Sequence, residues 1–235
     1  MKKSCTPISA CPMKPSVRPN SKWQKFLGAS FLPILVAGYF YPIIGFVILV
    51  CMIAGFTIAI KHGRKWCDVA CPRGSFLDFY ATKISPQKPL PKWFYTYKFR
   101  LTFITILFSF LTFNIVKAWP DITNIGFAFV KTLIITTILS IILAVIFRAR
   151  AWCLICPVGT FSGLIGGKKG RLKIDFAKCA NCTNCERVCP MGLVPYKDKH
   201  TGVLNSRDCI KCKTCIANCP TGAISFPRKD KKSKS

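Results

Sequence analysis

Acidic residues and histidines are scarce in this chain of 235 residues. Asp and Glu together number 8, and the two histidines are His62 and His200. A membrane haem of the b type needs a histidine pair within apolar spans, and neither histidine lies in one. The chain also lacks C-x-x-C-H, which covalent haem requires, and a glycine-rich nucleotide fingerprint. These absences argue against a haem protein and against a nucleotide-dependent dehydrogenase complete in itself.

Basic residues, by contrast, number 35 and give a formal net charge of +27. Such an excess can indicate nucleic-acid binding. Here, however, Lys and Arg gather beside the hydrophobic runs and at the C-terminus, as the positive-inside rule describes. We therefore expect membrane lipid as a partner and no nucleic acid. Residues 1–25 lack the apolar core of a cleaved signal peptide, and we interpret them as a basic cytoplasmic arm in which Cys5 and Cys11 are free thiols.

Cysteine is abundant, with 15 residues. Two runs, 179–190 and 209–220, each read C-x2-C-x2-C-x3-C-P. In bacterial two-cluster ferredoxins, which this segment resembles, three cysteines of a run bind one cluster and the fourth binds the other. Zinc sites and disulfide frameworks use different spacings. We therefore predict two [4Fe–4S] clusters, one bound by Cys179, Cys182, Cys185 and Cys219, the other by Cys209, Cys212, Cys215 and Cys189.

Long apolar runs occur only before residue 148. Residues 26–60 carry no charge, but one helix of that length would measure about 52 Å against a hydrocarbon core of about 30 Å. Pro42 therefore indicates a turn between two helices. Residues 77–100 are expected to form a cytoplasmic segment. The basic flanks place both termini in the cytoplasm. We expect four transmembrane helices, at about 26–41, 43–60, 101–116 and 126–147.

A second set of cysteines follows each predicted hairpin. Residues 66–76 read W-C-x3-C-P-x-G-S-F, and residues 152–161 read W-C-x2-C-P-x-G-T-F. This internal repeat predicts two hairpin units related by an axis along the membrane normal. That axis would bring together Cys67, Cys71, Cys153 and Cys156. Thiolates bind iron, copper(I) or zinc and also form redox-active disulfides, so either a metal centre or a redox centre fits these four residues.

The predicted fold class is a membrane α-helical protein of four helices in two hairpin repeats, joined to a small α+β two-cluster ferredoxin domain. The predicted parts are a basic arm at 1–25, a membrane domain at 26–170, a ferredoxin domain at 171–227 and a basic tail at 228–235. Because the clusters need a reducing compartment, the ferredoxin domain is expected on the cytoplasmic side of a bacterial inner membrane.

The two W-C motifs combined with the two ferredoxin runs, from about residue 22 to 226, resemble the NapH/MauN family of ferredoxin-type membrane proteins. This family is related to the membrane part of NosR and CcoG. One departure is the C-x2-C-P at Cys153, where family members typically have C-x3-C-P. The resemblance implies a quinol dehydrogenase component, not a complete enzyme. It would work with a periplasmic ferredoxin-type or cytochrome subunit, toward reductases of nitrate or nitrous oxide.

Two functions remain open at this point. In the first, the chain exchanges electrons between the quinone pool and a periplasmic reductase pathway. Its positively charged ferredoxin domain would also suit an acidic cytoplasmic redox protein. In the second, it is a maturation factor whose second cysteine set reduces or handles metal for a periplasmic metalloenzyme. No catalytic residue is predicted, and His62, Asp68 and Asp78 are the polar residues near the inner interface that could line a quinone site.

Overall fold

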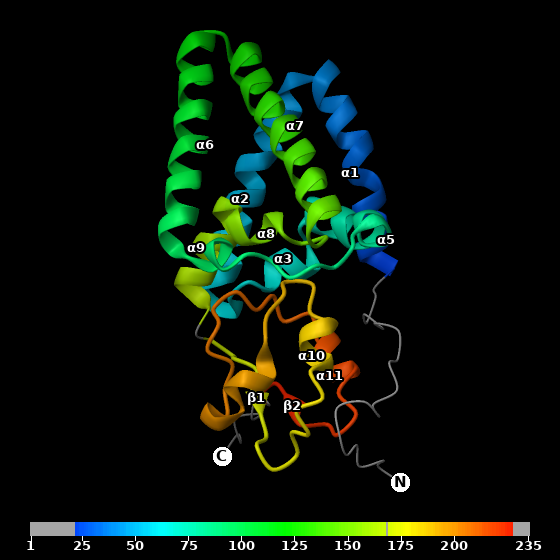
Figure 1. The fold of residues 1–235 in the computed structure, drawn as a ribbon. Coiled ribbons are helices and arrows are strands. Elements are labelled where there is room, and N and C mark those ends of the chain that lie inside the picture. Colours follow the sequence, from blue (N-terminus) through cyan, green and yellow to red (C-terminus); the bar gives the residue numbers. More distant parts are fainter. Residues whose placement is uncertain (1–21, 168, 228–235) are drawn as a thin grey trace, which may run out of the picture.

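The computed structural model describes residues 22–167 and 169–227 (Figure 1). Long helices stand side by side in one half of the molecule, a layer of short helices closes their lower ends, and the ferredoxin half lies beneath that layer (Figure 1). The long helices are α1 (Lys22–Phe40), α2 (Val47–His62), α6 (Tyr97–Ala118) and α7 (Ile122–Ile146). Most of the predicted arm at 1–25, with Cys5 and Cys11, and the tail at 228–235 lie outside the described residues.

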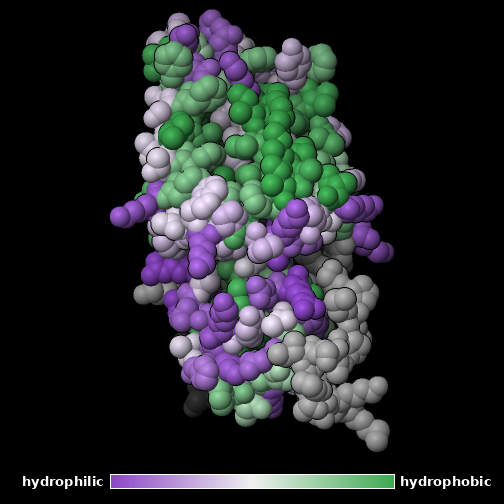
Figure 2. Space-filling model, viewed as in Figure 1, coloured by the Kyte–Doolittle hydropathy of each residue, from purple (hydrophilic) through white to green (hydrophobic). Residues whose placement is uncertain are grey.

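The long helices carry large apolar side chains on their outer surfaces. Figure 2 shows a broad hydrophobic band over this half and mainly hydrophilic residues below it. Phe40, Ile53 and Ile106 are each more than half exposed, as expected for helices that face lipid. The segments Pro42–His62, Tyr97–Ala118 and Ile122–Ile146 are long and apolar enough to cross a membrane. These three segments correspond to the second, third and fourth predicted spans.

The predicted turn at Pro42 is present as the 3-10 helix η1 (Pro42–Phe46), which packs against α7. Two glycines allow this close approach. A Cβ on Gly126 would lie 2.4 Å from the Pro42 carbonyl oxygen, and one on Gly45 would lie 2.5 Å from the Gly126 carbonyl oxygen. Only residues without a side chain fit both positions.

Both W-C motifs fold into a pair of short helices that is broken at the second cysteine. The first motif forms α3 (Lys65–Val69) and α4 (Pro72–Phe76), and the second forms α8 (Trp152–Ile155) and α9 (Pro157–Gly166). The proline after that cysteine begins the next helix, a position that suits its fixed φ and missing N–H. Helix α4 packs against α1, and α9 packs against α2.

The segment predicted as a cytoplasmic stretch at 77–100 contains short helical turns. They are the π-helix η2 (Leu77–Ala81), the helix α5 (Thr82–Ile84) and the 3-10 helix η3 (Lys92–Tyr95). Phe94 is 2% exposed and belongs to the same hydrophobic core as Trp152. This segment is therefore part of the floor beneath the long helices.

The ferredoxin half is small and α+β, as predicted. Strand β1 (Lys173–Ile174) pairs antiparallel with β2 (Ile224–Ser225), and the remaining elements are α10 (Asn184–Arg187), η4 (Pro195–Thr201) and α11 (Thr214–Ala217). One hydrophobic core contains Trp152 and Leu154 from the short helices together with Leu172, Met191 and Ile210. The core therefore continues across the boundary predicted at residue 170.

Candidate metal centres

The eight cysteines of the ferredoxin runs surround two separate cavities. One cavity is lined by Cys179, Cys182, Cys185 and Cys219, and the other by Cys189, Cys209, Cys212 and Cys215. These groups are the two sets expected from the spacing, including the exchange of the fourth cysteine between the runs. Helices α10 and α11, one from each run, contact each other and hold the runs together.

The backbone around the middle cysteine of each run has the same unusual conformation. Asn181 and Thr183 have φ values of 53° and 56°, and Lys211 and Lys213 have 60° and 63°. Left-handed conformations at non-glycine residues are uncommon and cost free energy, and they gather at functional sites. Alternation of such residues with right-handed ones turns successive N–H groups toward one concave side, which suits an anionic group.

The chemistry of these residues fits an iron–sulfur cluster. The Leu193 N–H points at the Cys189 sulfur at 3.4 Å. Burial raises the pKa of Cys185 and of Cys209 to about 12, while backbone N–H groups oppose that rise. A buried thiol of this kind is protonated at neutral pH unless a metal displaces its proton. Thiolate ligands with N–H donors aimed at sulfur are the donor set that such clusters use.

The second cysteine set also converges. Cys67, Cys71, Cys153 and Cys156 line one cavity of about 180 Å³, whose other walls are mostly apolar side chains of α1, α2 and α7. Because each W-C motif supplies two of the four cysteines, the cavity requires both motifs. We name this group the membrane-side set. Over the described ranges 22–167 and 169–227, no three His, Cys, Asp or Glu side chains are close enough to hold a single metal ion, and this holds for the ferredoxin cysteines too.

Two buried arginines cross between the motifs. Arg64, three residues before Cys67, donates from Nη2 to the carbonyl oxygen of Cys153. Arg150, three residues before Cys153, donates from Nη1 to the carbonyl oxygen of Cys67 at 2.6 Å. Both arginines are 0% exposed. The two motifs therefore bind each other through the same contact made in both directions.

The glycine shared by both motifs makes room for these arginines. A Cβ on Gly74 would lie 3.0 Å from the Cys67 carbonyl oxygen and 3.2 Å from Nη1 of Arg150. A Cβ on Gly159 would lie 2.7 Å from the Cys153 carbonyl oxygen and 2.6 Å from Nη2 of Arg64. This packing accounts for the G in C-P-x-G, which the sequence left unexplained.

Positive charge and N–H donors surround the membrane-side set. Nη2 of Arg73 lies 3.7 Å from the Cys156 sulfur, and the Gly74 N–H lies 3.4 Å from the Cys71 sulfur. Burial raises the pKa of Cys67 to about 12, and the Arg64 charge opposes the rise. The buried thiols therefore need a bound cation or nearby positive charge to become thiolates.

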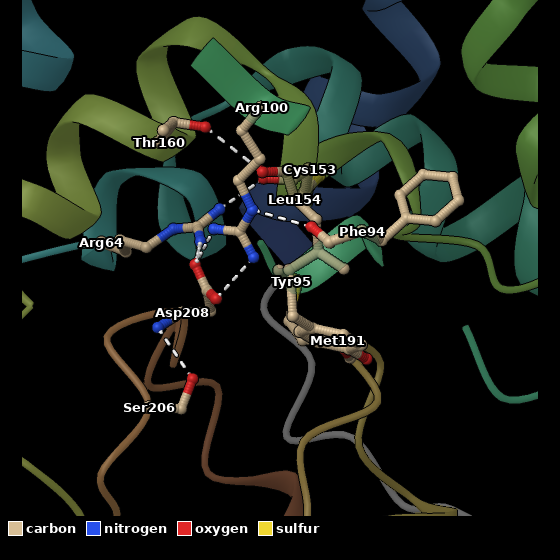
Figure 3. Close-up of polar contacts among 10 residues, drawn as sticks. All are labelled: Arg64, Phe94, Tyr95, Arg100, Cys153, Leu154, Thr160, Met191, Ser206 and Asp208. Atoms are coloured by element: carbon tan, nitrogen blue, oxygen red, sulfur yellow. Dashed lines mark hydrogen bonds and ion pairs between the residues drawn. The ribbon is translucent and has the colours of Figure 1, made fainter. Parts of the chain in front are cut away.

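Asp208 is the main polar link between the two halves of the protein (Figure 3). Its Oδ1 accepts from Nη1 of Arg64 at 2.6 Å and from Nη1 of Arg100 at 2.8 Å, and its Oδ2 accepts from Nη2 of Arg100 at 2.8 Å. Burial would raise the pKa of Asp208, but the hydrogen bond from Arg100 and the charge of Arg64 hold it below its ordinary value. Asp208 immediately precedes Cys209.

A second link holds the other end of the same ferredoxin set. Nη1 of Arg148 donates to the carbonyl oxygen of Cys189 at 2.6 Å, and its Nε donates to the Lys88 carbonyl oxygen at 3.0 Å. The Tyr95 hydroxyl lies 3.1 Å from the Met191 carbonyl oxygen. These contacts fall at or beside the set of Cys189, Cys209, Cys212 and Cys215, which we name the proximal set. The set of Cys179, Cys182, Cys185 and Cys219 is the distal set.

Sequence reasoning missed these arginines because it used them only as topology signals. The sequence pattern that could have indicated them is R-x-W-C, because an arginine stands two residues before the tryptophan of each motif, at Arg64 and Arg150. Asp78, which we considered for a quinone site, binds Arg150 through both carboxylate oxygens. Its buried charge is therefore used to pair that arginine.

The fold and these cavities define an iron–sulfur electron-transfer protein with an apolar helical half. A family model described as a 4Fe-4S dicluster domain matches residues 178–224. A second model, described as a 4Fe-4S binding domain, matches residues 44–91 and 130–175, and each of these segments contains one W-C motif.

The chain is similar to three curated proteins. It is 25% identical over 216 residues to an uncharacterised protein of Methanocaldococcus jannaschii, which covers 86% of this chain and 84% of that protein. It is 27% identical over 171 residues to the ferredoxin-type protein NapH of Escherichia coli, with 64% of this chain and 57% of that protein covered. It is 44% identical over 69 residues to NapH of Haemophilus influenzae, with 26% of this chain and 24% of that protein covered.

The matches therefore span from about a quarter to just over half of the length of these NapH proteins. No solved structure matches the chain. The two iron–sulfur family models and the NapH relatives agree, and the chain is similar to the NapH-type ferredoxin proteins.

Proposed function

We propose that this protein exchanges electrons between the quinone pool and a periplasmic reductase pathway of the nitrate or nitrous oxide type. Two [4Fe–4S] clusters, bound by the proximal and distal cysteine sets, would carry the electrons. When bound, such a cluster gains or loses one electron at a time. The observation that carries this proposal is the pair of four-cysteine cavities attached beneath an apolar helical bundle.

The remaining residues support this role by fixing the ferredoxin half against the helices. Arg148 holds the Cys189 carbonyl, and Arg64 and Arg100 hold Asp208 beside Cys209. Rigid attachment keeps the proximal set at a constant separation from the apolar bundle. Two sets also give the chain two one-electron acceptors, which is the number that a two-electron quinol requires.

The proposed topology has four membrane spans, with α1 as the first, in two hairpin repeats. The reciprocal contacts of Arg64 and Arg150 support the repeat, as do the two segments matched by one family model. The proposed domains are the membrane domain at 26–170 and the ferredoxin domain at 171–227. Both termini and the ferredoxin domain would face the cytoplasm of a bacterial inner membrane. The partners would be a periplasmic ferredoxin-type or cytochrome subunit and an acidic cytoplasmic redox protein.

The test is an anaerobic potentiometric EPR titration of the purified full-length protein, followed by addition of a soluble menaquinol analogue. We expect two cluster signals that titrate near the quinone couple and a reduction by the quinol. A Cys179→Ala variant should lose one signal. The matched control is Cys51→Ala, which removes a cysteine within α2 and should leave both signals unchanged. Potentials far below the quinone couple would overturn the proposal.

The second candidate function is maturation of a periplasmic metalloenzyme. The convergence of Cys67, Cys71, Cys153 and Cys156 on one cavity beside Arg73 supports it, because thiolates there could reduce or hold a metal for delivery. Serine variants of these four cysteines separate the two functions. A loss of quinol-dependent electron transfer favours the first. Retained electron transfer with loss of metal in the partner enzyme favours the second.

A further inference from the structure

The membrane-side set has the features that distinguish the two ferredoxin sets from an ordinary group of buried thiols. Its four cysteines lie around one cavity, as the ferredoxin cysteines do. A backbone N–H points at sulfur in both places, from Gly74 to Cys71 and from Leu193 to Cys189, at 3.4 Å in each case. The membrane-side set therefore shares the arrangement of four cysteines on one cavity with both ferredoxin sets, and the N–H contact to sulfur with the proximal set.

We propose that Cys67, Cys71, Cys153 and Cys156 together bind a third iron–sulfur cluster, of the four-iron class, shared between the two repeats. Each W-C motif supplies two ligands, so neither repeat can bind the cluster alone. This inference rests on the proposed electron-transfer function and deepens it by assigning the class of centre at the membrane-side set.

The charge around the cavity suits a cluster. A four-iron core with four thiolates is anionic, and a buried anion requires nearby positive charge. Nη2 of Arg73 lies 3.7 Å from the Cys156 sulfur, and its guanidinium carbon lies 4.9 Å from the centroid of the Trp152 ring. Among the residues with described positions, no carboxylate pairs with Arg73. By contrast, Asp208 pairs with Arg64 and Asp78 pairs with Arg150. The positive charge of Arg73 is therefore available to stabilise an anionic centre.

The width of the site also favours a cluster over a single ion. The membrane-side cysteines, like the proximal and distal cysteines, are not close enough to hold one metal ion. A single zinc or copper(I) needs its sulfur ligands gathered around one atom, whereas a four-iron cluster places each ligand on a different iron. The four cysteines share the lining of one cavity of about 180 Å³ with mostly apolar side chains.

One side chain connects this site with the ferredoxin half. Arg64 donates to the Cys153 carbonyl oxygen through Nη2 and to Asp208 through Nη1, and Asp208 precedes Cys209. Arg64 therefore links the backbone of the membrane-side set to the residue that precedes the proximal set's Cys209. A cluster here would make the protein a chain of three one-electron centres that begins at the apolar bundle.

Iron and acid-labile sulfide analysis of the anaerobically purified full-length protein tests the proposal, with Mössbauer and EPR spectra recorded on the same samples. Three four-iron clusters predict about twelve irons per chain. A Cys67→Ala/Cys153→Ala variant should contain about eight and keep both ferredoxin signals. The control is Cys11→Ala, which changes a cysteine outside both W-C motifs and both ferredoxin runs and should keep about twelve. Wild-type protein with about eight irons would overturn the third cluster and leave the two-cluster function standing. Wild-type protein with clearly fewer than about eight irons would contradict both the third cluster and the two-cluster function.

Other occupants give different results. Copper or zinc bound in wild type and lost from the double variant would overturn the cluster in favour of a metal-handling site. A disulfide among these four cysteines, detected by mass spectrometry in the anaerobic wild type, would overturn the cluster in favour of a thiol redox pair. If the double variant does not fold, Arg73→Gln replaces it, with Arg73→Lys as the charge-retaining control. We expect Arg73→Gln to lower the reduction potential of one of three signals. Three unchanged signals would overturn the proposal.

Discussion

Arg150 donates to the carbonyl oxygen of Cys67 at 2.6 Å, and Arg64 makes the equivalent contact with Cys153. Each arginine lies three residues before the first cysteine of its own motif and binds the carbonyl oxygen of the first cysteine of the other motif. Because both are fully buried, the two motifs depend on each other for their backbone positions. A substitution in either motif should therefore affect the cysteines of both.

Arg150→Ala should destabilise the protein strongly. The substitution removes the guanidinium that pairs with the Asp78 carboxylate, and breaking a buried ion pair costs about 3–5 kcal/mol in soluble proteins. Thermal unfolding in detergent, followed by near-UV circular dichroism, measures the effect. Arg150→Ala/Asp78→Asn should recover part of the loss because it also removes the carboxylate charge that Arg150 neutralises. Lys131→Ala, at an exposed position on α7, is the control and should change the midpoint little. Equal midpoints for Arg150→Ala and Lys131→Ala would contradict the role of Arg150.

Gly159→Ala tests the space reserved for Arg64. The new methyl group would lie 2.6 Å from Nη2 of Arg64 and 2.7 Å from the Cys153 carbonyl oxygen, so one of these contacts must break. Overpacking of this kind costs about 1–3 kcal/mol. Gly38→Ala is the matched control, because its Cβ would meet Val130 at an ordinary 3.4 Å within a helix. We expect a lower unfolding midpoint for Gly159→Ala than for Gly38→Ala, and the reverse order would refute this account.

The sequence predicted those features that depend on local spacing. The cysteine runs predicted both ferredoxin sets because ligand spacing within a loop is set by the cluster. Pro42 predicted the turn before α2, and long helices occur at all four predicted places. The ends differ because α6 starts at Tyr97, before the apolar run at 101, so that it includes the buried Arg100. Hydrophobicity alone cannot show where a helix continues beyond the apolar layer.

The arginine network could not be predicted in the same way. A basic residue beside a membrane span satisfies the positive-inside rule whether it is exposed or buried, so Arg64 looked like a topology signal. Its carboxylate partner, Asp208, is 144 residues away in the sequence. No local sequence pattern connects two residues that far apart. The role of Gly159 was hidden for the same reason, because its neighbour comes from the other repeat.

Asp208→Asn should loosen the ferredoxin half from the helices. The carboxylate neutralises two buried arginines, and removal of one partner from such a network costs about 3–5 kcal/mol. The control is Asp175→Asn, whose exposed pair with Lys178 contributes little to stability because solvent screens it. Limited proteolysis near residue 170, together with chemical unfolding, measures both effects. Faster cleavage and lower stability are expected for Asp208→Asn alone, and equal behaviour of the two variants would exclude the attachment.

The same carboxylate gives the attachment a dependence on pH. The pKa of Asp208 is lowered in the folded protein, so its pairing contributes stability above the ordinary carboxyl value of about 3.9. That contribution is lost as the pH falls through the folded pKa. We therefore expect the stability difference between wild type and Asp208→Asn to be constant near neutral pH and to shrink in strong acid. A difference that grows as the pH falls would have the wrong sign.

Arg148→Gln should change the proximal cluster and spare the distal one. The Arg148 guanidinium is bound to the Cys189 carbonyl at 2.6 Å and is 5% exposed, so its charge is poorly screened by solvent. A nearby cation stabilises the more negative, reduced form of a cluster, and its loss lowers the reduction potential. A change of about 1 kcal/mol corresponds to about 40 mV for one electron.

Potentiometric EPR measures this shift, and the Cys179→Ala background identifies the proximal signal because the distal set is then incomplete. Arg148→Lys keeps a charge but loses the two-pronged contact with Cys189 and Lys88, so it should recover part of the shift. If Arg148 acts only by holding the domains together, Arg148→Gln and Arg148→Lys should shift both clusters alike. A shift confined to the proximal signal and reduced by lysine is the result that its position beside Cys189 requires.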